Sequence, residues 1–167
     1  MVVVLLLVGP LEAADVLSLA SLGNAEYASS WTVSGRVRLR DGHYREPAAP
    51  GSATEIRVWL LERIATWTAV GTRYAAVILV TDPGGSGTFS DLVVVQNRRG
   101  RPVQAANSEL GDRVRVQSLG VARRNGQTEI HVGLVAPGPD DPLCCPTRRV
   151  VRVFVWNGRS LVPRAAE

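Results

Sequence analysis

The sequence predicts an all-β protein in which antiparallel strands form a meander that closes into a sandwich, a barrel or a blade-like sheet, with at most one short amino-terminal helix. Two observations carry this prediction. Residues 74–97 hold two apolar runs around the turn residues PGGSG, which is the pattern of a buried β-hairpin. Other segments alternate apolar and polar residues at the period of two that strands impose, and turn residues separate them.

The remaining elements follow from the same two signals. Residues 15–24 suit a short helix or an ordered lead-in that ends at Gly23 and Asn24. Between 61 and 72 the period is not clean, and residues 136–147 contain four prolines that exclude a regular element. The expected strands number about seven to nine. In chain order they cover residues 36–40, 55–61, 74–82, 88–97, 101–110, 113–119, 129–134, 150–156 and 159–162.

The chain divides into an apolar leader at residues 1–14 and a single β-rich domain at residues 15–167. The whole chain has 167 residues, a length that one hydrophobic core can stabilise. The apolar run in the leader is far shorter than the roughly 20 residues that a membrane helix needs. It suits a degenerate export signal, although no positive residues precede it. We therefore expect no transmembrane span and an extracytoplasmic location, either periplasmic or secreted.

The basic residues are all arginine: the chain has 19 of them, no lysine, and a net charge of only +4. Alternation places six of these arginines on outward strand faces, where neighbouring strands would give a basic surface. They are Arg36, Arg38, Arg40, Arg113, Arg115 and Arg152. Few aromatic residues share those faces to stack on bases, so we do not expect the protein to bind nucleic acid.

The glycine-rich turn at 84–87 invites comparison with a nucleophile elbow around Ser86. Thr88 stands where that motif needs its last glycine, and a strand follows where it needs a helix. A hairpin turn is therefore the favoured interpretation. Ser86, Asp82 and Asp91 remain weak catalytic candidates, because a hydrolase would need such groups near the turn.

The two histidines carry no metal-binding motif. His43 stands beside a turn, and His131 shares a strand face with Glu129. A metal site would have to gather both from distant segments together with a carboxylate or thiolate. We therefore assign no metal, no cofactor and no catalytic residue from motifs.

The only cysteines are the neighbours Cys144 and Cys145. Adjacent Cα atoms lie about 3.8 Å apart, below the roughly 4.4–6.8 Å usual for a disulfide, so a bond between them would be strained and easily reduced. An oxidised pair, buried thiols and intermolecular pairing remain open. An oxidised pair would lock the proline-rich loop, and a redox role is its alternative.

Several segments in combination resemble a family of uncharacterised bacterial secreted or lipid-anchored proteins. They are NAEY at 24–27, SGRVRLRDGHY at 34–44, AAVILVTDPGGSGTFSDLVVVQNRRGRPV at 75–103, LGDRVRV at 110–116 and DPLCCPT at 141–147. The resemblance spans most of the chain after residue 24 and implies location and fold more than activity. Members of that family carry an acidic, calcium-type loop before the central hairpin. Residues 65–73 here contain no acidic residue, so no cation site is carried over.

These observations favour a non-enzymatic, extracytoplasmic β domain at the bacterial envelope. Its role would be structural, or it would bind a ligand or a partner protein. The sequence specifies strands and turns clearly, but it contains no recognisable set of catalytic residues. The alternatives are a hydrolase with its site near the hairpin turn at 82–91, or a redox-responsive protein that uses the Cys144 and Cys145 pair.

Overall fold

The computed structural model describes residues 15–142 and 144–164 and is nearly all β-strand, as predicted. Its middle layer is a five-stranded antiparallel sheet in the order β3-β4-β5-β6-β7. The strands are β3 (His43–Pro47), β4 (Glu55–Ala69), β5 (Thr72–Asp82), β6 (Phe89–Asn97) and β7 (Pro102–Asp112). The predicted buried hairpin is β5 with β6, and β5 is the central strand.

A four-stranded antiparallel sheet in the order β11-β10-β9-β8 packs on one face of the middle sheet. Its strands are β8 (Arg115–Arg124), β9 (Gln127–Ala136), β10 (Arg148–Trp156) and β11 (Leu161–Pro163). Ile78 and Leu92 of the middle sheet meet Ile130 and Phe154 of this one in the core. Burying each such side chain contributes about 1.5–3 kcal/mol. The two sheets form a sandwich, and the described residues close no barrel.

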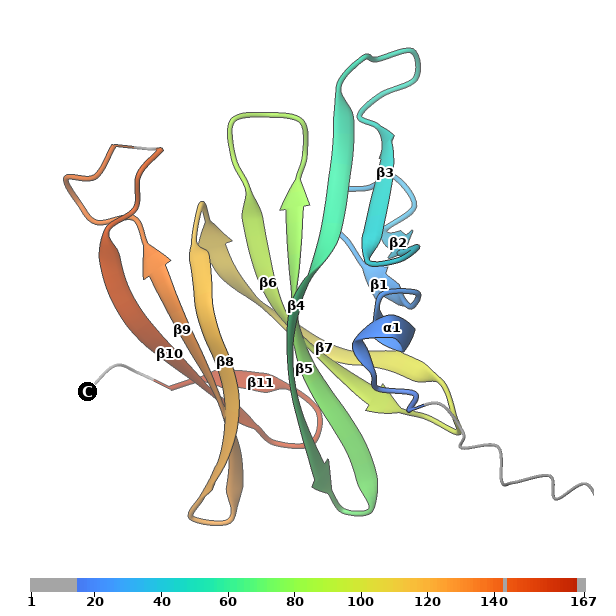
Figure 1. The fold of residues 1–167 in the computed structure, drawn as a ribbon, viewed down its shortest axis with the longest axis vertical. Coiled ribbons are helices and arrows are strands. Elements are labelled where there is room, and N and C mark those ends of the chain that lie inside the picture. The colour runs from blue at the N-terminus through green and yellow to red at the C-terminus, as the bar shows by residue number, and fades with distance from the viewer. Residues whose placement is uncertain (1–14, 143, 165–167) are drawn as a thin grey trace, which may run out of the picture.

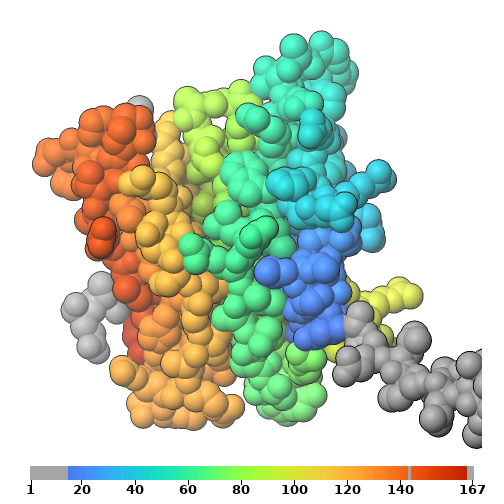
Figure 2. Space-filling view, viewed as in Figure 1, coloured from blue at the N-terminus to red at the C-terminus, as the bar shows by residue number. Residues whose placement is uncertain are grey.

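A thinner third layer covers the opposite face of the middle sheet. It contains α1 (Leu19–Leu22) and the two-stranded sheet of β1 (Glu26–Ala28) and β2 (Arg36–Arg38). Tyr27 and Val37 of this layer pack against Ala75 and Val77 of β5. The three layers stand side by side in Figures 1 and 2, coloured orange, green and blue. Because β5 is buried on both faces, its sequence is a continuous apolar run instead of an alternating one.

The predicted short helix is present within residues 15–24. Ser18 caps its first turn, since the Ser18 hydroxyl accepts from the Ser21 amide at 3.2 Å, and Gly23 ends it. The apolar leader at 1–14 lies outside the described residues. Within the part of the chain that the structure describes, no helix is long and apolar enough to cross a membrane.

The segment after residue 61 continues β4 as far as Ala69. The pairing of β4 with β5 shifts register between Leu60 and Ile64, and Val70 with Gly71, both at positive φ, turns the chain into β5. Such an irregularity inserts residues on one strand and offsets the alternation of its side chains. This is why the period is not clean between 61 and 72.

The described residues form eleven strands, more than the seven to nine expected. The additional strands are the short β1 and β3, which the sequence pattern did not separate from their neighbours. β3 is decisive for the site, because it forms an edge of the middle sheet.

Candidate functional site

Two arginines face each other at the β3 edge of the middle sheet. Arg45 on β3 pairs with Arg57 on β4, and Arg57 pairs with Asp82 on β5. Directly opposed residues of antiparallel strands project from the same face, so the three side chains form a row. Arg57 Nη2 lies 2.6 Å from Asp82 Oδ2. Among the described residues, no carboxylate pairs with Arg45.

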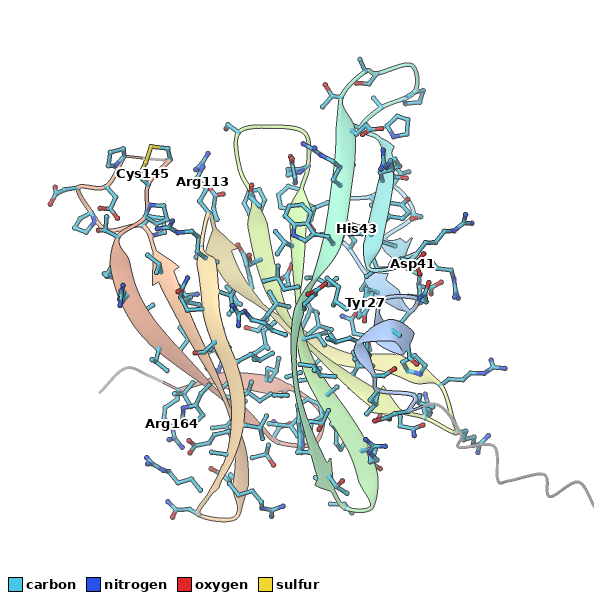
Figure 3. All side chains as sticks on the ribbon, viewed as in Figure 1. Tyr27, Asp41, His43, Arg113, Cys145 and Arg164 are labelled. Atoms are coloured by element: carbon cyan, nitrogen blue, oxygen red, sulfur yellow. A yellow bond between two sulfur atoms is a disulfide. The ribbon has the colours of Figure 1, made fainter. Side chains whose placement is uncertain are left out.

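The next row along the strands contains His43 on β3 and Trp59 on β4. Trp59 is half-buried against the core, whereas His43 is exposed. In Figure 1 the opposite ends of β3 and β4, joined by the loop at 48–54, rise above the four-stranded sheet, and Figure 3 shows His43 well below that loop. The two rows line an open hollow of about 410 Å³, a size within the range of ligand sites.

A second hollow of about 540 Å³ lies around the β3 edge. It shares His43, Tyr44 and Arg45 with the first and adds Arg38 and Arg40. Arg38 Nη2 is 3.8 Å from Glu26 Oε2, and no carboxylate among the described residues pairs with Arg40. The residues lining the two hollows are hereafter the arginine groove.

The arginine groove is arranged to hold an anion. Like charges directly opposite on neighbouring strands destabilise a sheet, and Arg45 with Arg57 is such a pair. An anion between them would relieve that repulsion, and a guanidinium offers two parallel donors to a carboxylate, sulfate or phosphate. Trp59 adds an aromatic surface beside the cations.

The backbone edge of β3 offers few hydrogen-bonding groups to a docking strand. The His43 amide and carbonyl are already bonded to Arg40. Pro47 has no amide hydrogen. Side chains, and not strand addition, therefore define what this edge can recognise.

Ser86 is exposed at the tip of the turn between β5 and β6. Its backbone carbonyl accepts from Arg113, and Thr88 donates its amide to Asp112 at 2.9 Å. Gly84 adopts φ 83°, and a Cβ there would lie 2.9 Å from the Glu55 carbonyl oxygen. The glycines therefore serve the turn, and among the described residues no hydrogen bond joins the Ser86 hydroxyl to a base.

The structure separates the two candidate carboxylates. Asp82 faces the arginine groove, and its other oxygen accepts from the Gly84 amide at 2.9 Å. Asp91 projects from the opposite face, into a cavity of about 50 Å³ beneath Trp31. Burial raises the pKa of Asp91, and the charge of Glu109 raises this pKa further. Asp82 and Asp91 therefore do not form an acid and base pair.

Cys144 and Cys145 form a disulfide with Cα atoms 3.8 Å apart, and both residues are exposed. Asp141 organises the same loop: its carboxylate accepts from the Gly138 amide and the Thr147 amide, each at 2.7 Å. These hydrogen bonds, that of Gly138 first, lower the pKa of Asp141. Figure 3 shows Cys145 at the far side of the molecule from His43, so the loop and the arginine groove are separate.

The other histidine is tied to the protein. His131 Nε2 lies 3.1 Å from Glu129 Oε2, and Arg164 Nη2 lies 2.7 Å from Glu129 Oε1, outside hydrogen-bond geometry. Glu129 is only 1% exposed, a burial that its place on a polar strand face did not indicate. No group of three potential metal ligands occurs among the described residues.

The six arginines predicted to share an outward surface lie in different parts of the molecule. The prediction is wrong for Arg113, which precedes β8 in a turn and pairs with Asp112. Arg115 is exposed on β8 and donates to the Pro146 carbonyl at 2.9 Å. Arg36, Arg38 and Arg40 are exposed on the third layer and its continuation. The prediction is also wrong for Arg152, which lies on the inward face of β10 and donates to the Leu110 carbonyl at 2.6 Å.

The arginine groove instead includes Arg45 and Arg57, which sequence reasoning missed. Arg45 follows His43 on β3, and Arg57 precedes Trp59 on β4, each two residues apart on one strand face. This pattern indicates a site only when β3 is known to pair with β4.

Comparison with known proteins found no family model, no curated protein and no solved structure that matches the chain.

Proposed function

We propose that this protein is a non-enzymatic binding domain that takes an anionic ligand in the arginine groove. The observation that carries the proposal is the unmatched positive charge of the groove. Arg40 and Arg45 have no carboxylate partner among the described residues, and Arg45 stands opposite Arg57. A site that keeps this arrangement is stabilised when an anion enters it.

The chemistry of the groove supports binding more than catalysis. Two carboxylates line the groove: Asp82 is paired with Arg57, and Glu55 is exposed two residues before Arg57 on β4. The histidine of the groove is also exposed to solvent. General acid and base work needs positioned proton donors and acceptors that converge on one reacting group. The groove instead offers guanidinium donors and one aromatic face, which are groups that recognise a ligand.

An extracytoplasmic role at the bacterial envelope remains part of the proposal. The disulfide between Cys144 and Cys145 supports it, because disulfides persist in oxidising compartments outside the cytoplasm. Arginine contacts with an anion also tolerate a range of external pH, since the guanidinium remains protonated.

The test uses the purified chain and trigalacturonate, a short acidic oligosaccharide, in isothermal titration calorimetry at low salt. The Arg40→Gln/Arg45→Gln variant should bind about tenfold more weakly, equivalent to about 1.4 kcal/mol. The matched control is Arg124→Gln/Arg149→Gln, which removes the same charge from exposed positions on the four-stranded sheet.

Equal losses in the two variants would show only a general effect of net charge and would contradict a defined groove. The fully methyl-esterified trisaccharide, which carries no charge, should not bind. If it binds as well as trigalacturonate, anion recognition is wrong.

A further inference from the structure

The positive surface does not end at the arginine groove. A third hollow of about 510 Å³ lies between the β1–β2 sheet and β7, the other edge strand of the middle sheet. Arg36, Arg38 and Arg101 line it, together with the amides of Gln104 and Asn107. Gln104 also ties the layers together, since its side-chain oxygen accepts from the Ala28 amide at 2.8 Å.

Arg38 belongs to both the second hollow and the third. The first and second hollows already share His43, Tyr44 and Arg45. The three hollows therefore follow one another around the third layer, from β4 to β7. Six arginines line this path, hereafter the arginine band: Arg57, Arg45, Arg40, Arg38, Arg36 and Arg101.

The band is not uniformly basic. Glu26 lies in the third hollow, 2.7 Å from Arg36 and 3.8 Å from Arg38, and Asp82 lies in the first hollow beside Arg57. Carboxylates and amides accept hydrogen bonds from the hydroxyl groups of a ligand. A ligand built of closely spaced phosphates has no such hydroxyl groups to donate. A ligand that carries both acidic groups and hydroxyl groups matches this alternation.

From this arrangement we infer that the ligand is a linear acidic polysaccharide that runs along the arginine band and contacts more than one hollow. Because this inference rests on the proposed binding at the arginine groove, it adds the length and the chemical class of the ligand. A chain that links two hollows makes its second contact at a high effective concentration, so affinity rises with length.

Single-stranded nucleic acid fits the band less well. Sequence-tolerant binding of single strands depends on several aromatic platforms along the path. Trp59 and Tyr44 are the aromatic residues that line the three hollows, and the Tyr44 hydroxyl is bonded to Glu46 at 2.7 Å. The third hollow contains no aromatic lining residue.

The experiment compares trigalacturonate with decagalacturonate on the wild-type chain and on two band variants. Arg40→Gln/Arg45→Gln alters the near end of the band, and Arg36→Gln/Arg101→Gln alters the far end. We expect decagalacturonate to bind the wild type at least about tenfold more tightly than trigalacturonate. The far-end variant should lose this advantage while its affinity for trigalacturonate stays within about twofold.

The Arg124→Gln/Arg149→Gln control should keep the advantage, and thermal melting should confirm that every variant is folded. Equal affinity of the two oligomers for the wild type would overturn the inference yet leave anion binding at the groove intact. If the near-end variant bound trigalacturonate as tightly as the wild type, the proposed function would be refuted instead. Tighter binding of a deoxythymidine decamer than of decagalacturonate would overturn the polysaccharide class.

Discussion

Three buried or half-buried charged side chains of the four-stranded sheet and its loops, Glu129, Arg152 and Asp141, differ from the exposed Arg40 and Arg45 of the β1–β4 edge in one respect. In the four-stranded region the protein itself supplies their partners: Glu129 contacts Arg164 and His131, Arg152 donates to a carbonyl, and Asp141 holds its own loop. At the β1–β4 edge, Arg40 and Arg45 have no carboxylate partner among the described residues.

This difference separates charges that stabilise the fold from charges available to a ligand. A buried or half-buried ion that loses its partner costs stability, whereas an exposed arginine can be removed at almost no cost. Substitutions in the two regions should therefore have opposite profiles. Substitutions of Glu129, Arg152 or Asp141 or of their partners should change stability and spare binding, and substitutions of Arg40 and Arg45 should do the reverse.

The largest expected effect is that of Arg164→Ala. It leaves the Glu129 carboxylate, 1% exposed, with only the His131 ring beside it. Removing one partner of a buried pair costs about 3–5 kcal/mol, and we expect the lower end because Arg164 is itself part-exposed. Urea unfolding measures this loss.

The Glu129→Leu/Arg164→Leu double variant provides the control for Arg164→Ala. It removes both charges, so it should regain most of the lost free energy of unfolding. A double variant as unstable as Arg164→Ala would show that the loss comes from packing and not from a stranded charge.

Arg152→Met should have the next largest effect. The pairing of β6 with β7 shifts register at Asp91, so Leu110 has no opposite residue on β6, and Arg152 supplies a donor to its carbonyl at 2.6 Å. Losing a hydrogen bond to a charged donor costs about 1.5–3 kcal/mol. Thermal melting should show this loss, while the exposed Arg149→Met on the same strand should remain near wild type.

Removing the disulfide should cost less. The loop closed by Cys144 and Cys145 is the shortest that a chain can form, so its entropic contribution is only about 1 kcal/mol. The Cys144→Ser/Cys145→Ser variant and the reduced wild type should therefore melt at nearly the same, slightly lowered temperature. A loss several times larger would mean that the disulfide, and not Asp141, holds the loop.

Acidification should act on the same loop through Asp141. Its folded-state pKa lies below the ordinary value, so its contribution is present at neutral pH and is lost as the pH falls through that lowered pKa. The amide shift of Thr147, which donates to Asp141, should report this transition in NMR spectra. Asp141→Asn should abolish it, and a transition that survives in this variant would assign it to another group.

The smallest expected effect on stability is that of Arg45→Gln. The arginine is exposed and opposes Arg57, so the free energy of unfolding should change by no more than about 0.5 kcal/mol, upward at low salt. High salt should remove even this difference. A clear destabilisation in urea would show that Arg45 has a structural partner.

Most of the fold could be predicted because turns and periodicity are local signals. The Asn125 and Gly126 turn and the continuous apolar run of β5 specify their elements directly. The β4 irregularity could not be predicted, because a register shift depends on the partner strand. The division of residues 27–44 into β1, a loop and β2 likewise depends on the third layer packing on β5.

Less of the candidate site could be predicted. Arg38 and Arg40 stood out by alternation, but the arginine groove arises from the cross-strand pairing of Arg45 with Arg57, which requires β3 as a strand of its own. Arg152 was misplaced because apolar residues occupy both faces of β10, so its sequence does not show which face is inward. The burial of Glu129 could not be predicted, because the sequence does not show whether a carboxylate on a strand face is exposed or is buried beside a partner.

Anion binding at the arginine groove is tested most directly by NMR of the arginine side chains during titration with trigalacturonate. The Nε–Hε signals of Arg40, Arg45 and Arg57 and the indole signal of Trp59 should shift together and saturate. Those of Arg124 and Arg149 should stay in place. Shifts spread evenly over all five arginines, or no shift at the groove, would contradict the proposal.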